Sequence, residues 1–177
     1  MKYIFVSDIH GDVERFKEIV KIFENENADR LVLLGDTSSD YSKNCDEEIA
    51  EILNSMKQKV DVIRGNCDTR RFEELLEFEI YSLDNLYVNG KFVTFTHGHY
   101  YNMYIIPENC GDIFIQGHTH VPILQVINKR IFANPGSVSR PRGTDLRCYV
   151  LIDEEKIYLK TLDGKVVKSL EIGTVLF

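Results

Sequence analysis

Closely spaced cysteine pairs are missing from this sequence. Its four cysteines stand at positions 45, 67, 110 and 148 and form no CxxC motif. This spacing argues against a zinc ribbon and against a disulfide-bonded scaffold, and it predicts reduced thiols in a cytoplasmic protein. A chain of 177 residues buries a sufficient core without disulfides or a structural metal. We therefore expect any metal that it holds to serve chemistry.

Long apolar runs and an excess of positive charge are also missing. No stretch approaches the roughly 20 apolar residues that span a bilayer, and the first apolar run stops at Asp8, too early for a signal peptide. Lysine and arginine total 21 against 28 aspartates and glutamates, which gives a net charge of −7. Because phosphate backbones and anionic membranes attract positive fields, we expect neither non-specific nucleic-acid binding nor a membrane partner.

Short apolar runs alternate with amphipathic stretches in the first part of the chain. The apolar runs predict strands over Lys2–Ser7, Arg30–Leu34 and Val60–Arg64. Helical spacing of apolar side chains predicts helices over Asp12–Asn27 and Asp46–Lys59. Strands that are apolar throughout are typical of a parallel sheet that is covered on both faces.

Antiparallel hairpins are predicted further along the chain. Asn89-Gly90 is a strong turn signal between two apolar runs, and an acidic turn at 153–155 separates two more. Residues 100–111 are ambiguous, because Pro107 shortens any helix there. The pattern predicts one α/β domain over residues 1–177, with mixed sheets layered against helices. Strands are expected at 86–88, 92–96, 112–116, 130–133, 148–152 and 156–161.

The histidines gather at the ends of predicted strands. All five lie in the clusters Asp8-Ile9-His10, His97-Gly98-His99 and His118-Thr119-His120. Two other strands end in Gly35-Asp36 and Gly65-Asn66-Cys67-Asp68. Because ligands collect at the carboxyl ends of the strands in open α/β sheets, we expect these side chains to form one pocket.

The donors in this pocket are imidazole nitrogens with carboxylate and amide oxygens, a set that suits manganese, iron, cobalt, nickel or zinc. Each motif alone has an ordinary structural interpretation, such as a turn residue or two histidines on one strand face. Five motifs in order, all at strand ends, favour a metal site over coincidence. The glycines beside them are expected to let the backbone approach the ions closely.

The ordered motifs resemble those of the calcineurin-like metallophosphoesterases. The short length and the segment Asn134-Pro135-Gly136-Ser137 resemble the small YfcE-type phosphodiesterase branch, and the match runs over about residues 1 to 143. The motifs that carry it are Asp8-x-His10, Gly35-Asp36, Gly65-Asn66-x-Asp68, Thr96-His97-Gly98-His99 and Gly117-His118-Thr119-His120.

The resemblance implies a four-layer α/β/β/α sandwich, in which two mixed β-sheets are flanked by helices. It also implies two divalent metal ions, with manganese expected and nickel, iron, cobalt or zinc as alternatives. A hydroxide that bridges the ions would attack the phosphorus of a small phosphate ester in line with the leaving group. One ion would be held by Asp8, His10 and His120, the other by Asn66, His97 and His118, with Asp36 between them and His99 beside the site.

Cys67 departs from the broader family, in which a histidine at this position is taken to protonate the leaving group. A thiol is a weaker proton donor, so the departure favours a phosphodiesterase over a phosphomonoesterase. Whether Cys67 donates a proton or only fills space stays open. A second hypothesis is a scaffold without turnover, because a relative in the retromer coat keeps this fold with eroded metal motifs, whereas every expected ligand type is present here.

Several other residues are weaker candidates. Arg140 and Arg142 suit a phosphate as bidentate donors, although solvated surface charge is the more ordinary interpretation. Arg64 flanks the Asn66 loop. Tyr100 can stack on a base, but core packing is the favoured expectation for it. Related small enzymes often form dimers or tetramers, so a homo-oligomer is a further expectation.

Overall fold

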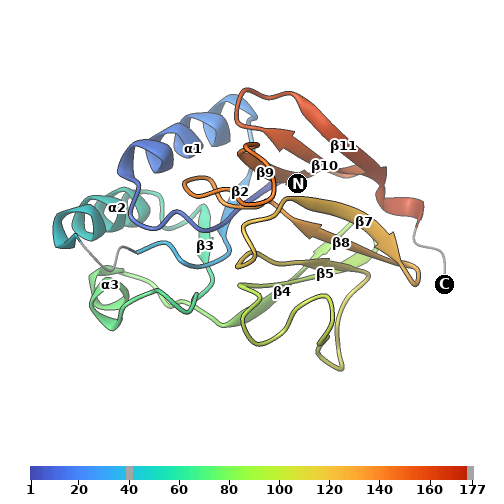
Figure 1. The fold of residues 1–177 in the computed structure, drawn as a ribbon, viewed down its shortest axis with the longest axis horizontal. Helices are drawn as coiled ribbons and strands as arrows, with labels where there is room; N and C mark the ends of the chain where they lie inside the picture. The colour runs from blue at the N-terminus through green and yellow to red at the C-terminus, as the bar shows by residue number, and fades with distance from the viewer. Residues whose placement is uncertain (39–41, 175–177) are drawn as a thin grey trace.

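Two β-sheets pack face to face in the computed structural model, which describes residues 1–38 and 42–174 (Figure 1). One sheet has the strand order β11-β10-β9-β1-β2-β3 and the other β4-β5-β6-β8-β7. Both are mixed, so the predicted α/β fold with two mixed sheets is confirmed. The strands are β1 (Tyr3–Val6), β2 (Arg30–Leu33), β3 (Val60–Val62), β4 (Leu83–Val88), β5 (Lys91–Thr96), β6 (Ile113–Ile115), β7 (Ile123–Ile127), β8 (Arg130–Asn134), β9 (Cys148–Ile152), β10 (Lys156–Thr161) and β11 (Val166–Glu171). The helices are α1 (Val13–Asn25), α2 (Lys43–Ser55) and α3 (Arg70–Leu75), with a 3₁₀ turn at Ile172–Thr174.

Parallel pairing aligns the carboxyl ends of the strands that precede the histidine clusters. In the first sheet β1, β2 and β3 are parallel neighbours, with Leu33 paired to both Val6 and Val62. In the second sheet β5 and β6 are parallel, with Phe95 opposite Ile115. The loops after all five strands therefore leave the sheets at shared edges.

The main core lies between the two sheets. Phe5 of β1 and Phe95 of β5 meet there edge to face, with ring centroids 5.6 Å apart, and both are almost fully buried. Aliphatic side chains from both sheets surround them. Burying an aliphatic or aromatic side chain stabilises the fold by about 1.5–3 kcal/mol, so this layer fixes how the two sheets face each other. Its aliphatic members include Val32, Leu34, Val93, Ile113, Ile115, Ile131, Val150 and Ile152.

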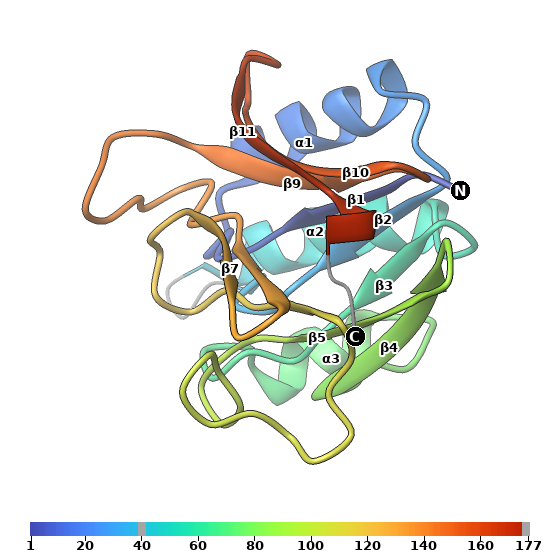
Figure 2. The same ribbon diagram turned by 90° about the vertical axis from the view of Figure 1, so that its right-hand side faces the viewer.

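The helices cover the outer face of the first sheet (Figure 2). α1 begins after Asp12, whose carboxylate accepts a hydrogen bond from the backbone N–H of Arg15. Its buried face carries Phe16 and Ile19 at helical spacing, which packs the helix against β1 and β2. Among the described residues, no helix combines the length and the apolar character needed to cross a membrane.

An irregular segment, residues 98–112, covers the outer face of the second sheet in place of the expected helical layer. Its backbone is tied to that sheet: Met103 donates to the side chain of Gln116, and Gly111 donates to the hydroxyl of Thr94. A helix is prevented by Pro107, which has no N–H, and by Asn102, whose side-chain oxygen accepts from two following backbone N–H groups.

Some elements were absent from the prediction, and others were shifted. α2 begins at Lys43 instead of Asp46 and ends at Ser55. The prediction missed α3 because it has only six residues, and it missed the edge strand β11 because most of its side chains are exposed and give no burial alternation. It also missed β7, which lies at the other sheet's edge.

Replacing Phe95 with alanine is expected to lower the free energy of unfolding by about 3–5 kcal/mol, because a cavity would open between the sheets. Phe92→Ala is the matched control, since Phe92 lies on the same strand and is 57% exposed. It is expected to cost about 0.5 kcal/mol or less. Urea unfolding of the two variants measures the difference, and equal losses would contradict this account of the core.

Candidate metal centre

The candidate ligands lie close together at the ends of five strands. Asp8 and His10 follow β1, Asp36 follows β2, and Asn66 and Cys67 follow β3. The remaining histidines, His97 and His99 after β5 and His118 and His120 after β6, come from the second sheet. Backbone hydrogen bonds join neighbouring loops at the end of each sheet: the N–H of His10 donates to the carbonyl of Asp36, and the N–H of Gly117 donates to that of His97.

The backbone is strained at five of these positions. Positive φ angles between 49° and 66° occur at Asp8, His10, Asp36, His118 and His120. Non-glycine residues rarely adopt this left-handed conformation, which costs about 1–2 kcal/mol per residue. Residues of this kind concentrate at functional sites, where the surrounding structure holds them in place.

Glycines let the loops approach each other closely. A Cβ atom on Gly65 would lie 2.2 Å from both the backbone nitrogen and the Oδ1 atom of Asp36. A Cβ atom on Gly117 would lie 1.8 Å from the hydroxyl of Ser7. Any larger residue at either position would therefore displace a neighbouring loop of the site.

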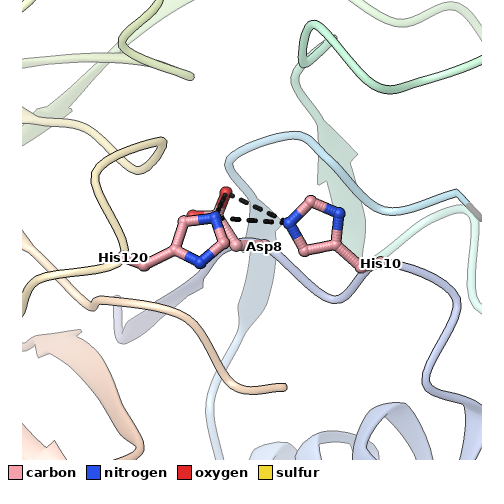
Figure 3. A group of neighbouring side chains, drawn as sticks. All are labelled: Asp8, His10 and His120. Carbon is pink, nitrogen blue, oxygen red and sulfur yellow. Dashed lines mark hydrogen bonds and ion pairs between the residues drawn. The ribbon is translucent and has the colours of Figure 1, made fainter. Parts of the chain in front are cut away.

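The first group of donors is Asp8, His10 and His120 (Figure 3). Nε2 of His120 lies 3.2 Å from Oδ1 of Asp8, and Nε2 of His10 lies 3.3 Å from Nε2 of His120. Figure 3 shows the two imidazole rings facing each other beside the Asp8 carboxylate. Asp8 is fully buried, and its Oδ1 faces the Nε2 atoms of His120 and His10.

The second group is Asp36, His97 and His118. Nε2 of His97 lies 3.4 Å from Oδ1 of Asp36 and 3.2 Å from Nδ1 of His118. Asn66 joins this group, because its Oδ1 lies 3.1 Å from the same nitrogen. Asp36 also lies 3.9 Å from His10, so its carboxylate stands between the two groups.

Backbone carbonyls fix which nitrogen of two histidines is left for a ligand. Nδ1 of His97 lies 2.7 Å from the carbonyl of Leu34, and Nδ1 of His120 lies 2.7 Å from that of Arg140. Each Nδ1 must carry the proton to donate to a carbonyl, so in the neutral ring Nε2 holds a lone pair. Both lone pairs then face carboxylate or amide oxygens, which also carry lone pairs. Only a proton or a cation relieves this repulsion, so the donor set suits a divalent ion.

Burial and neighbouring charges shift the pKa values in this cluster. Burial alone would raise the pKa of Asp36, but the hydrogen bond and charge of His97 outweigh it and hold that pKa well below its ordinary value. Burial opposes protonation of His97, yet Asp36 raises its pKa overall. The hydrogen bond to Asp8 raises the pKa of His120. For the other three rings, His10, His99 and His118, burial lowers the pKa.

Cys67 and His99 lie beside these groups in different ways. The sulfur of Cys67 is close to the donor atoms of His10 and Asp36, all within 4.8 Å of one another, and its backbone N–H donates to Oδ1 of Asp36 over 2.8 Å. The ring of His99 lies 5.3 Å from that of His97, centroid to centroid, and belongs to neither group of donors.

Asp68 is a positioning residue that was not among the predicted site residues. Its buried carboxylate accepts hydrogen bonds from four backbone N–H groups, those of Asp36, Thr37, Ser38 and Gly65. It therefore locks the loop after β2 onto the loop after β3 and so positions Asp36 against Asn66. Its position in the Gly-Asn-x-Asp motif is the sequence feature that could have identified it.

The weaker candidates lie at the rim. Arg140 and Arg142 are exposed, and the loop that carries them contacts His120 through backbone groups. Tyr100 is 71% exposed, so the expected core packing is wrong for this residue. Its ring lies against that of His99, with centroids 4.1 Å apart. Both residues belong to the irregular segment 98–112, in which Pro107 and Asn102 prevent a helix.

The chain resembles known proteins of a family that agrees with the candidate metal site. The family model of the calcineurin-like phosphoesterase superfamily domain matches residues 1–156. This chain belongs to that superfamily. A curated relative, phosphodiesterase YfcE of Escherichia coli strain K12, is 32% identical over 173 residues, covering 93% of this chain and 94% of the relative.

Solved structures of other proteins share the fold. The E. coli YfcE phosphoesterase structure superposes with a TM-score of 0.89 at 29% identity, covering 97% of this chain and all of the other. Vps29 from Entamoeba histolytica gives a TM-score of 0.66 at 18% identity, covering 97% of this chain and 99% of that one, which shows the fold alone. Membership of the superfamily implies divalent metal cofactors, and both donor groups lie where the strand-end motifs predicted a pocket.

Opposed pKa shifts predict that the metal-free protein is most stable near pH 6.5, the ordinary histidine pKa. The raised pKa values of His97 and His120 give stability that is complete below the unfolded-state pKa and is lost as pH rises through the folded-state values. The lowered pKa values of the other three rings give stability that is present above the unfolded-state pKa and is lost as pH falls through the folded-state values.

Urea unfolding with a chelator, from about pH 5 to 8.5, measures this maximum. Repeating the series with manganese is the control, because an ion binds neutral imidazole and should remove the decline above the maximum. A metal-free protein whose stability keeps rising through that range would contradict the assigned tautomers and charges.

Proposed function

We propose that this protein is a phosphodiesterase that depends on two divalent metal ions and cleaves a small phosphate ester by in-line attack of hydroxide. The observation that carries the proposal is the pair of donor groups that share Asp36: one contains Asp8, His10 and His120, and the other contains His97 and His118. The relatives that are named phosphodiesterases support the reaction class.

Each donor has a distinct role in this proposal. Asp8, His10 and His120 hold one ion, Asn66, His97 and His118 hold the other, and Asp36 bridges them. When bound, such a pair of ions lowers the pKa of water towards neutrality and stabilises charge on the phosphoryl oxygens. Manganese is the ion we propose, because oxygen and imidazole donors suit it and the donor groups include no thiolate other than Cys67 at their edge.

The protein's own charges prepare the site for a phosphate. The carboxylates of Asp8 and Asp36 bring two negative charges, while neutral imidazoles and the Asn66 amide bring none. Two divalent ions would therefore keep an excess of about two positive charges for hydroxide and a phosphoryl group. Leu34 and Arg140 keep the Nδ1 protons of His97 and His120 in place, so that Nε2 stays a donor to metal during the reaction.

Cys67 decides which esters react well in this proposal. Its sulfur lies beside Asp36 and His10, and in the proposal it is the side chain nearest the oxygen that leaves the phosphorus. A thiol is a poor proton donor at neutral pH, and general acid help is worth about 10²–10⁴-fold. Diesters with acidic leaving groups are therefore favoured over monoesters of ordinary alcohols.

Manganese-loaded protein is expected to hydrolyse bis(4-nitrophenyl) phosphate, measured by release of 4-nitrophenolate. Asp36→Asn and His97→Gln are each expected to lower kcat by more than about 100-fold, since residues that merely orient metal ligands are worth about 10–100-fold. Asp163→Asn is the control, because Asp163 is exposed in the turn between β10 and β11. Metal-loaded, folded protein without turnover would instead support a scaffold of the same fold.

Cys67→His is expected to supply the missing proton donor and to raise hydrolysis of glycerol 2-phosphate, a monoester of an ordinary alcohol, relative to the diester by up to about 100-fold. Cys67→Ala is the matched variant, because it removes the thiol without adding a donor. The ratio of kcat values for the monoester and the diester is the measurement. An unchanged ratio in Cys67→His would show that this position does not reach the leaving oxygen.

A further inference from the structure

A polar hollow opens beside the second group of donors. Its volume is about 440 Å³, which lies within the range of small-molecule sites, about 300–1,000 Å³. We call it the side hollow. It is lined by Arg64, Asn66, Asp68, Ser82, His99 and Tyr100.

Asn66 connects the side hollow to the candidate metal centre. This residue lines the hollow, and its Oδ1 lies 3.1 Å from Nε2 of His97. His99 also spans the boundary, because its ring centroid lies 5.3 Å from that of His97 and 6.3 Å from that of His118. A phosphoryl group held by the second donor group would therefore carry one of its substituents into the hollow.

One wall of the hollow is aromatic. The rings of His99 and Tyr100 lie 4.1 Å apart, and the Tyr100 ring is 71% exposed. Nδ1 of His99 is buried without a hydrogen-bond partner among the described residues. An exposed tyrosine beside a cavity offers a face on which a planar group can stack.

The lining of the hollow also carries a cation. Nη2 of Arg64 lies 2.8 Å from Oε1 of Glu73, and the Arg64 side chain is half exposed. A guanidinium has five N–H donors, so Arg64 can keep this ion pair and still donate to a ligand. The Asp68 carboxylate, which also lines the hollow, does not compete for Arg64, because four backbone N–H groups already donate to it.

We propose that the side hollow binds one ester group of the substrate, a planar aromatic group that stacks on Tyr100 and presents an acceptor oxygen to Arg64. This inference rests on the proposed function, and it makes Tyr100 and Arg64 the residues that select the substrate. It names the substrate class as phosphate esters of aromatic or heteroaromatic alcohols.

Three phosphonates that cannot be hydrolysed test the inference by calorimetric binding to the manganese-loaded protein. Methylphosphonate probes the metal centre alone, phenylphosphonate adds a planar ring, and 4-carboxyphenylphosphonate adds an acceptor for Arg64. The wild-type protein is expected to bind them with increasing affinity in that order.

Two variants test the contributions of Tyr100 and Arg64 separately. Tyr100→Leu is expected to reduce the preference for phenylphosphonate over methylphosphonate by about two- to tenfold, the usual range for an aromatic pair. Arg64→Gln is expected to keep that preference and to lose the gain from the carboxylate. Unchanged methylphosphonate binding shows that each variant is folded with its metal centre intact.

Matched controls carry the same substitutions outside the hollow. Tyr104→Leu replaces a tyrosine that is 87% exposed, and Arg70→Gln replaces an arginine whose side chain is 88% exposed and pairs with Glu74. Both are expected to leave all affinity ratios unchanged. If the wild type binds methylphosphonate but gains nothing from the ring, or if the gain survives Tyr100→Leu, the side hollow is not the ester site. If no phosphonate binds and no diester is cleaved, the proposed function itself has failed.

Discussion

Two backbone carbonyls determine what the histidines at this site can do. The carbonyls of Leu34 and Arg140 each accept the Nδ1 proton of an imidazole, so the Nε2 lone pairs of His97 and His120 turn inward. There they meet the oxygens of Asp36, Asn66 and Asp8 at 3.1–3.4 Å. Acceptors that face acceptors in a buried site repel each other, and a positive charge between them removes the repulsion. The raised pKa values of these two rings and the suitability of the site for a cation therefore have one cause.

The rest of the fold holds this arrangement in place. Left-handed backbone at five candidate ligands costs several kcal/mol in sum. The core between the sheets fixes the five strand ends, and Asp68 ties the loops after β2 and β3 together through four hydrogen bonds. Glycine at position 65 then permits a contact that no side chain would allow. The stability that the buried core provides therefore offsets the cost of the strained backbone at the site.

The sequence was informative where a rule of topology applies. Parallel strands of one sheet end at the same edge, so motifs such as Asp8-x-His10 and Gly35-Asp36 were expected to meet, and the structure brings His10 and Asp36 together. The hydrogen-bond partners of the imidazole Nδ1 atoms could not be predicted. They are backbone carbonyls, which every residue has, so residue type does not indicate which carbonyl will accept. Tyr100 was expected in the core, since aromatic residues are usually buried. Its exposure follows from the irregular path of residues 98–112, which depends on side-chain contacts with the second sheet.

Two features of the site that arise independently favour the same kind of ester. The thiol of Cys67 lies beside Asp36 and His10, and it is a weak acid catalyst for an alcohol that must be protonated as it leaves. A phenol, with a pKa near 10 as in tyrosine, leaves as an anion far more readily and needs little help from a proton donor. The side hollow, on the flank of His97 and His118, offers a tyrosine face and a guanidinium, which suit an aromatic group of this kind. The two proposals are chemically consistent, because an ester with an acidic leaving group needs no strong proton donor at position 67.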